Sequence, residues 1–186
     1  NIVSRAACNK CHGDSKLHAG FAVELCVGCH NQNSFDPFSG FGSPTLTTTD
    51  TALLGSSAVV LERVVHKIHM GKDLVNGFVI NGTHDYSALQ YPRGVRWSSS
   101  TPNASDCTAC HDETNAAMTE AARWKFANRA CGSCHDGIAT QAHIAANTFD
   151  PTPYDVPAGQ YSGDEIESCS ICHAPGGLAP VDEAHL

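Results

Sequence analysis

All ten cysteines of this chain belong to one repeated pattern, Cys-x-x-Cys-His, which occurs five times in 186 residues. The cysteines are Cys8, Cys11, Cys26, Cys29, Cys107, Cys110, Cys131, Cys134, Cys169 and Cys172. The histidines that follow them are His12, His30, His111, His135 and His173. This pattern is the attachment signature of c-type haem, with the thiols bonded to the porphyrin and the histidine on the iron. We therefore expect five covalently bound haem c groups, with these histidines as proximal iron ligands.

Zinc sites and disulfides are the alternative interpretation of paired cysteines. Two Cys-x-x-Cys units form one four-thiolate zinc site, so five units would leave one pair over. Zinc also gives no reason for a histidine after every pair. The pattern therefore favours haem over zinc.

Five haems leave little polypeptide for each, because 186 residues divided by five is about 37. Only 7% of the residues are aromatic, and glycine (16) and proline (9) are frequent, which is a weak composition for a protein core. We expect a mainly α fold with much irregular loop. It would be one compact multihaem cytochrome c domain, residues 1–186, with five packed haems as its core. By analogy with metal sites that supply folding free energy, the chain without haem should be largely unfolded.

The formal charge of -8 excludes some classes of function. Nucleic-acid binding needs clustered basic side chains, whereas the 11 lysines and arginines are scattered. The sequence contains no run of about 18 apolar residues, so it predicts no transmembrane helix. A recognisable signal peptide is also missing, so we expect a mature chain or an excised module. Because haem attachment to thiols is completed outside the cytoplasm, the protein should be exported.

A few segments have a clear secondary-structure signal. Residues 58–69 show helical periodicity, with Ser57 as a candidate N-cap and Gly71 as a stop. Residues 31–57 are rich in Ser, Thr, Gly and Pro, which indicates loop. The remaining expectations are a short hairpin around 78–82, helices at 115–128 and 138–147, and a helical approach to the last motif at 164–169.

Six further histidines are candidates for the distal side of the irons: His18, His66, His69, His84, His143 and His185. A second histidine lowers a haem potential, a methionine raises it, and an open position permits catalysis. His66 and His69 are one helical turn apart and share a face, so each can reach one of two closely packed haems. No carboxylate or thiol nearby completes a shared metal site for this pair.

The other candidates differ in their settings. His18 follows the first motif closely, and His143 should face inward with Ile138 and Ala142 on its helix. His185 is the penultimate residue, and an iron would order a chain end that otherwise frays.

His84 lies in the turn-forming string Asn-Gly-Thr-His-Asp, so we expect it to be the spare histidine. Met70 and Met118 are the only thioether candidates. Met70 points off the His66/His69 face, which favours a packing role. None of the five motifs has lysine in place of its histidine, a change that would indicate an open catalytic haem.

Several stretches resemble one protein family. The most specific is Val-His-Lys-Ile-His-Met-Gly-Lys-Asp-Leu at 65–74, and the others lie at 8–31, 85–92 and 172–185. Together they resemble the pentahaem domains of the outer-membrane decahaem cytochromes of metal-reducing bacteria, the MtrC/OmcA type.

This resemblance implies five low-spin haems with two histidines each, displayed on the cell surface. It implies electron transfer to ferric minerals, metal chelates or flavins, with other redox proteins or haem domains as partners. Carried over position by position, the distal ligands are His18, His66, His69, His143 and His185. The resemblance assigns no catalytic residue.

Two other functions remain open at this point. One is a multihaem reductase, an enzyme with one open haem iron, and the number of spare histidines argues against it. The other is a soluble electron shuttle of the periplasm, which the segment at 65–74 disfavours relative to the cell-surface family.

Overall fold

The computed structural model describes residues 3–13, 23–31, 34, 59–81, 83–90, 107–111, 128–152 and 164–185. The chain forms two compact units. One unit contains residues 1–29, 92–125 and 171–186, and the other contains residues 30–91 and 126–170.

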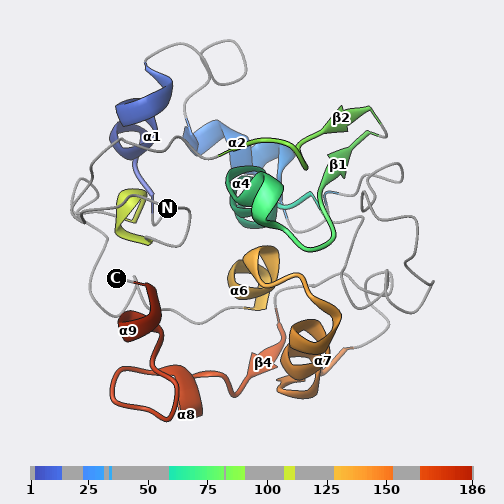
Figure 1. Cartoon of the computed structure of the whole chain (residues 1–186), viewed down its shortest axis with the longest axis vertical. Coiled ribbons are helices and arrows are strands. Elements are labelled where there is room, and N and C mark those ends of the chain that lie inside the picture. The colour runs from blue at the N-terminus through green and yellow to red at the C-terminus, as the bar shows by residue number, and fades with distance from the viewer. Residues whose placement is uncertain are drawn as a thin grey trace. The chain divides into compact units, whose positions relative to one another are not determined.

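The first unit contains short helices. They are α1 (Arg5–His12), α2 (Val23–Cys29), the 3-10 turn η3 (Cys107–Ala109) and α9 (Val181–His185), while α8 (Ser170–His173) begins at the last residue of the other unit (Figure 1). Helix α1 has a regular N-cap, because the Ser4 hydroxyl accepts a hydrogen bond of 3.1 Å from the backbone N–H of Ala7. Each of these elements includes residues of a Cys-x-x-Cys-His motif, or, for α9, a candidate distal histidine.

The second unit contains three helices and two small antiparallel sheets among its described residues. The helices are α4 (Leu61–Met70), α6 (Asn128–Cys134) and α7 (Ile138–Ala146), with a 3-10 turn η2 (Gly71–Asp73) after α4. The strands are β1 (Val79–Ile80) paired with β2 (His84–Asp85), and β3 (Thr148–Phe149) paired with β4 (Ile166–Glu167). Helix α4 packs against α6, and α6 packs against α7 (Figure 1).

Helix α4 begins three residues later than its periodicity predicts, at Leu61 instead of residue 58. The N-cap is Val60 in extended conformation, and the predicted cap, Ser57, lies outside the described residues. The backbone N–H of Leu61 donates to the carbonyl of His30 at 3.0 Å, and that of Val59 donates to the carbonyl of Ser34 at 3.2 Å. These long-range hydrogen bonds hold the chain extended up to residue 60, so the helix starts after them.

The end of α4 confirms the prediction, since the helix stops at Gly71. Gly71 has a φ of +48°, a region that favours glycine. A Cβ atom at this position would lie 2.1 Å from the carbonyl oxygen of Leu89. The same oxygen accepts a hydrogen bond of 2.9 Å from the N–H of Lys72, so this close approach is part of the fold.

The apolar core of the second unit lies beside α4. Val64, Leu74 and Phe78 are buried together, and Met70 and Tyr86 are among the residues packed against them. The position of Met70 supports the predicted packing role. The rings of Phe78 and Tyr86 are 6.3 Å apart, a distance typical of interacting aromatic pairs.

The β1–β2 pair confirms the predicted hairpin, with Ile80 opposite His84 and Asn81 at a φ of 52° in the turn. Helix α7 confirms the helix predicted at 138–147, with Asn147 as its C-cap. The helix predicted at 164–169 is wrong, because Ile166–Glu167 forms a strand that pairs with Thr148–Phe149.

Most of the predicted helix at 115–128 and most of the predicted loop at 31–57 lie outside the described residues. The described part of the chain is mainly α with short strands and irregular segments, which agrees with the expected fold class. It holds no helix with the length and apolar character needed to cross a membrane. A core of five packed haems, and a single domain over residues 1–186, stay predictions.

Candidate haem-attachment sites

The Cys-x-x-Cys-His motifs fold as helical turns. In the fourth motif the N–H of His135 donates to the carbonyl of Cys131 at 2.9 Å, and in the third the N–H of His111 donates to Cys107 at 2.8 Å. The first motif lies wholly within α1. In a helical turn, residues three apart are neighbours, so the two thiols of each motif project on the same side. None of the ten cysteines, all of which lie in the described ranges, forms a disulfide, and each is exposed or half-buried. This arrangement fits two thioether bonds to one porphyrin.

The zinc alternative predicts that cysteines from different motifs come together. Within the described ranges, no group of three or more His, Cys, Asp or Glu side chains is placed to hold a metal ion.

Two of the predicted proximal histidines have their ring orientation fixed by backbone carbonyls. Nδ1 of His30 lies 2.8 Å from the carbonyl oxygen of Val59, and Nδ1 of His173 lies 2.9 Å from that of Ala179. A carbonyl can only accept, so Nδ1 carries the proton in both rings. Nε2 then has its lone pair available for a metal, which is the arrangement that metal-binding histidines adopt.

The predicted distal ligand His69 shows the same arrangement. Its Nδ1 donates to the carbonyl of Val65, one turn earlier in α4, at 2.8 Å. This bond fixes the tautomer and leaves Nε2 as the donor atom for iron. The chemistry of His69 therefore fits the role that its spacing from His66 predicts.

The fifth motif is followed by a tight loop that returns to it. The N–H of Ala179 donates to the carbonyl of Cys172 at 3.0 Å, which places the Ala179 carbonyl beside the ring of His173. A Cβ atom on Gly177 would lie 2.4 Å from the carbonyl oxygen of Cys172, so only glycine fits there. The Gly-Gly pair at 176–177 thus positions the acceptor of the His173 ring.

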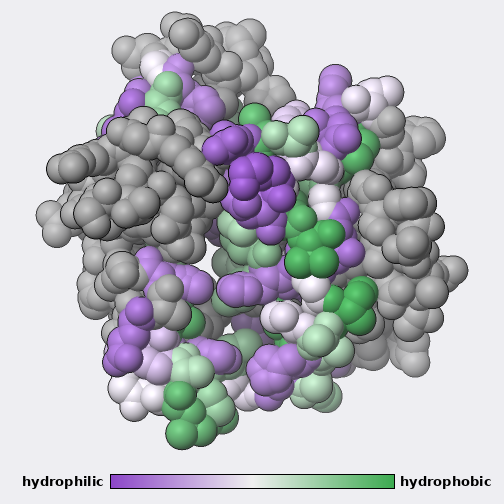
Figure 2. Space-filling view, in the orientation of Figure 1, coloured by the Kyte–Doolittle hydropathy of each residue, from purple (hydrophilic) through white to green (hydrophobic). Residues whose placement is uncertain are grey.

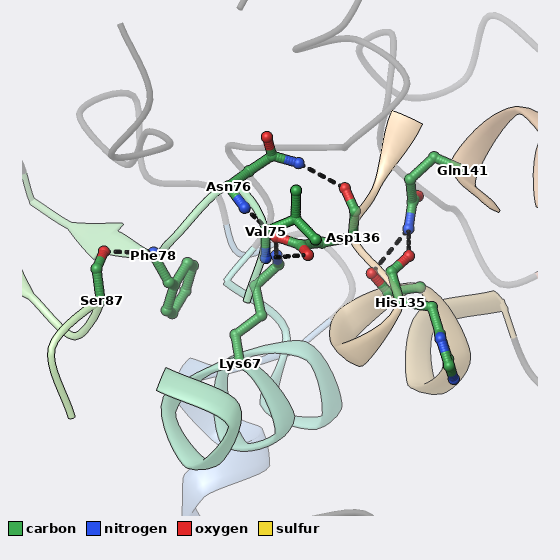
Figure 3. A network of polar contacts seen from close by, with 9 residues as sticks. Lys67, Val75, Asn76, Phe78, Ser87, His135, Asp136 and Gln141 are labelled. Carbon is green, nitrogen blue, oxygen red and sulfur yellow. Dashed lines mark hydrogen bonds and ion pairs between the residues drawn. The ribbon is translucent and has the colours of Figure 1, made fainter. Parts of the chain in front are cut away.

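Two buried side chains hold the fourth motif (Figure 3). Nε2 of Gln141, from α7, donates to the carbonyls of Gly132 at 2.9 Å and His135 at 2.6 Å. The Asp136 carboxylate accepts hydrogen bonds from the backbone N–H groups of Val75 at 2.8 Å and Asn76 at 2.9 Å. Figure 3 shows the ring of His135 pointing away from these contacts.

The same network contains buried basic groups from α4. Nζ of Lys67 lies 4.0 Å from Oδ2 of Asp136 and 5.6 Å from the centroid of the Phe78 ring. Burial and, to a smaller extent, the charge of buried Arg63 lower the pKa of Lys67 to about 8, while the Asp136 carboxylate opposes the shift. The positive charge on this face of α4 is therefore close to the fourth motif.

In the fifth motif, burial raises the pKa of the Cys169 thiol, with a smaller contribution from Glu167.

Large apolar side chains are exposed beside some of the cysteines. Leu25 and Val27 flank Cys26, and Ile171, which is 77% exposed, lies between the two cysteines of the fifth motif. Figure 2 shows apolar residues at the surface in several places among the polar ones. Such side chains fit the apolar faces of a porphyrin.

The remaining distal candidates are in different settings. His66 is half-buried on α4, His185 is half-buried on α9, and His18 lies outside the described residues. His84 is exposed on β2, which agrees with its predicted place in a surface turn region. The prediction that His143 faces inward is wrong: His143 is exposed.

The buried face of α7 is formed by Gln141 and Ile144, while Ile138 and Ala142 are exposed. Two residues along an α-helix correspond to a rotation of about 200°, so position 143 lies on the side of α7 opposite Gln141. Gln141 makes the contact of α7 with α6. The helix therefore presents His143 away from the protein core.

Sequence reasoning missed Asp136, Asn76 and Gln141 as residues of the site. The only sequence signal for Asp136 is its position directly after the motif histidine. Asn76 and Gln141 carry no local signal, because their partners are 60 and 9 residues away.

Comparison with known proteins gives one family. Residues 1–186 match the family model described as outer membrane cytochrome MtrC/MtrF-like, domains II/IV. A crystal structure of the outer membrane decaheme cytochrome OmcA is similar at 20% sequence identity, over 94% of this chain and 22% of that chain, with a TM-score of 0.43. The chain thus spans about a fifth of the length of that cytochrome. No curated protein matches the chain.

Proposed function

Because the chain belongs to the family of MtrC/MtrF-like outer membrane cytochromes, domains II/IV, we propose that it is an electron relay with five c-type haems. Each haem would be attached through one Cys-x-x-Cys pair and bound by the histidine that follows. His18, His66, His69, His143 and His185 would complete the coordination of the irons. The acceptors would be extracellular: ferric minerals, metal chelates or flavins.

The observation that carries this proposal is the fixed tautomer of the motif histidines. His30 and His173 donate from Nδ1 to main-chain carbonyls in two separate units of the chain. A histidine prepared in this way is a donor to metal through Nε2, and the hydrogen bond at Nδ1 increases its basicity. An electron-rich axial ligand favours ferric iron and lowers the potential.

The protein groups have distinct tasks in this proposal. When bound, haem supplies one-electron chemistry at iron. The helical turns hold two thiols on one side for attachment, and the carbonyls of Val59, Val65 and Ala179 orient imidazoles. Gln141 and Asp136 hold the main chain of the fourth motif.

A reductase with an open iron is the alternative function. Six histidines outside the motifs are available for five irons, so every iron can be given a second histidine. We therefore propose an electron carrier without a catalytic site, in which metal reduction takes place at an exposed haem edge. We place it at the cell surface, on the outer membrane of the bacterium, because this is where the family name locates its members.

Intact mass and ligand binding test the proposal together. The matured protein should exceed the polypeptide mass of 19.6 kDa by five haem units. The reduced protein should not bind carbon monoxide rapidly, because all five irons carry two histidines. A gain of four haems or fewer would contradict the haem count. Stoichiometric binding of carbon monoxide by one iron would instead support the reductase.

A further inference from the structure

We propose that Asp136 is a positioning residue for the haem of the fourth motif. It holds the turn Cys131–His135 in a fixed place relative to helix α4, which carries His66 and His69. This inference rests on the proposed function, since it concerns the haem that this motif would carry.

Both carboxylate oxygens and the main-chain carbonyl of Asp136 accept hydrogen bonds from one short segment, Val75 and Asn76. Oδ1 accepts from the N–H of Val75 at 2.8 Å, and Oδ2 accepts from the N–H of Asn76 at 2.9 Å. Its main-chain carbonyl accepts from Nδ2 of Asn76 at 2.6 Å. Asp136 is 1% exposed and Asn76 is 7% exposed, so these bonds are shielded from water. Hydrogen bonds to a charged acceptor are about twice as strong as neutral ones.

The segment that Asp136 binds is itself fixed to α4. Leu74 donates its N–H to the carbonyl of Gly71, the residue that ends the helix, and its side chain is buried against Val64 of α4. In addition, Lys67 reaches from the helix to within 4.0 Å of Oδ2 of Asp136. The carboxylate therefore contacts both the helix and the chain directly after it, as Figure 3 shows.

Gln141 has a different task in the same motif. Its amide binds the carbonyls of Gly132 and His135, so it stabilises the shape of the turn from within α6 and α7. The hydrogen bonds of Gln141 in this network go to the fourth motif itself, whereas Asp136 connects the turn to α4. Removal of Asp136 should therefore leave the motif folded but change where it lies relative to His66 and His69.

The position of this turn matters for the haem. Asp136 is the residue next to His135, the proximal ligand of the fourth motif. A small rotation of the turn would change the orientation of the His135 imidazole. Loss of the buried carboxylate would remove a negative charge from the residue next to the proximal ligand. Negative charge stabilises ferric iron, so its loss raises the potential of that haem.

The test uses the matured protein and the substitution Asp136→Asn. The side-chain amide has one acceptor oxygen for two N–H donors, and its own NH₂ group faces the second donor. Asp136→Glu keeps the charge and both oxygens, so it should restore most of the wild-type behaviour. Asp73→Asn is the matched control. Asp73 lies in the turn Gly71–Asp73, shortly before Val75, and its exposed carboxylate pairs with Lys72.

Two measurements read the result: a redox titration that resolves the five transitions, and the low-spin signals in electron paramagnetic resonance. We expect Asp136→Asn to raise the potential of one haem and to shift one low-spin signal, while the other four stay in place. Asp136→Glu should shift the same transition less, and Asp73→Asn should shift none.

Three outcomes would overturn the inference. One is a fully matured Asp136→Asn protein with all five transitions unchanged. Another is an equal shift of all five, which would indicate a general structural role. The third is a shift of the same size in Asp73→Asn.

If Asp136→Asn does not mature, Asn76→Ala decides the question. It removes only the bond from Nδ2 to the Asp136 carbonyl, so a smaller shift of one transition supports the inference, and no shift overturns it. A failure of the proposed function is recognised separately, in the wild type: the peptide that contains Cys131 and Cys134 would then carry no haem mass.

Discussion

Replacing Gly71 by alanine tests how helix α4 ends. Gly71 has a φ of +48°, and an added Cβ would lie 2.1 Å from the carbonyl oxygen of Leu89. That contact is with main chain, so a side-chain rotation cannot relieve it. The main chain at Leu89 must move away. The hydrogen bond of 2.9 Å from the N–H of Lys72 to the carbonyl oxygen of Leu89 is then lost.

The expected loss of stability is the sum of three contributions. A left-handed backbone costs an L-residue about 1–2 kcal/mol. Loss of a hydrogen bond costs about 1 kcal/mol. The smaller conformational entropy of alanine in the unfolded chain returns about 0.4–1 kcal/mol. The net effect is a decrease of about 2 kcal/mol, which corresponds to a melting temperature about 4–8 °C lower for a chain of this size.

Thermal unfolding of the matured protein, followed by far-ultraviolet circular dichroism and by the haem Soret band, measures this effect. Gly137→Ala is the matched control in the same unit, because Gly137 has a φ of -67° and its nearest Cβ contact would be 4.0 Å, to Val75. Gly13→Ala isolates the backbone contribution, since Gly13 has a φ of +64° with nothing within 4 Å of the added Cβ. We expect Gly137→Ala to be neutral or slightly stabilising and Gly13→Ala to be intermediate. Equal melting temperatures for Gly71→Ala and Gly137→Ala would refute the reasoning.

Two further predictions concern the histidines and the fourth motif. His84→Ala should leave the optical spectrum and the redox titration nearly unchanged, because His84 is exposed on β2. His185→Ala should open one iron, which then binds carbon monoxide. If His84→Ala opened an iron and His185→Ala did not, His84 would be the fifth distal ligand. Gln141→Ala should lower the unfolding free energy by about 2–3 kcal/mol, because two main-chain carbonyls lose their donor in a buried site. Gln141→Glu should destabilise more in a chemical denaturation experiment, since a carboxylate would face both carbonyl oxygens, and a neutral effect of either change would contradict the assigned contacts.

Local patterns predicted those parts of the fold whose determinants are local. The helical periodicity before Gly71 and the turn residues after Phe78 led to α4 and the β1–β2 hairpin, and both are present. The five motifs predicted haem c, because their residue spacing is set by the covalent chemistry of one cofactor. The stretch at 65–74, together with the other similar stretches, predicted the family, and the family model confirms it.

The errors have long-range causes. The start of α4 is set by hydrogen bonds from Val59 and Leu61 to residues near the second motif. The segment at 166–167 forms a strand because Thr148–Phe149 offers it a partner, which no local pattern reveals. The expectation that His143 faces inward rests on the apolar residues Ile138 and Ala142 of the same helix, whereas a polar residue, Gln141, makes the buried contact of α7.

The carbonyls that orient the histidines have a consequence for how the site can be studied and how it can change. The acceptors at positions 59, 65 and 179 are main-chain oxygens, which every amino acid supplies. Alanine substitution at these three positions will therefore leave the hydrogen bonds to the histidine rings in place. Related proteins can carry different side chains at these positions for the same reason. Replacing the amide by a backbone ester at the following residue would weaken the acceptor itself. The orientation and basicity of these imidazoles therefore depend on the course of the main chain. Substitutions that keep this course leave the hydrogen bonds intact.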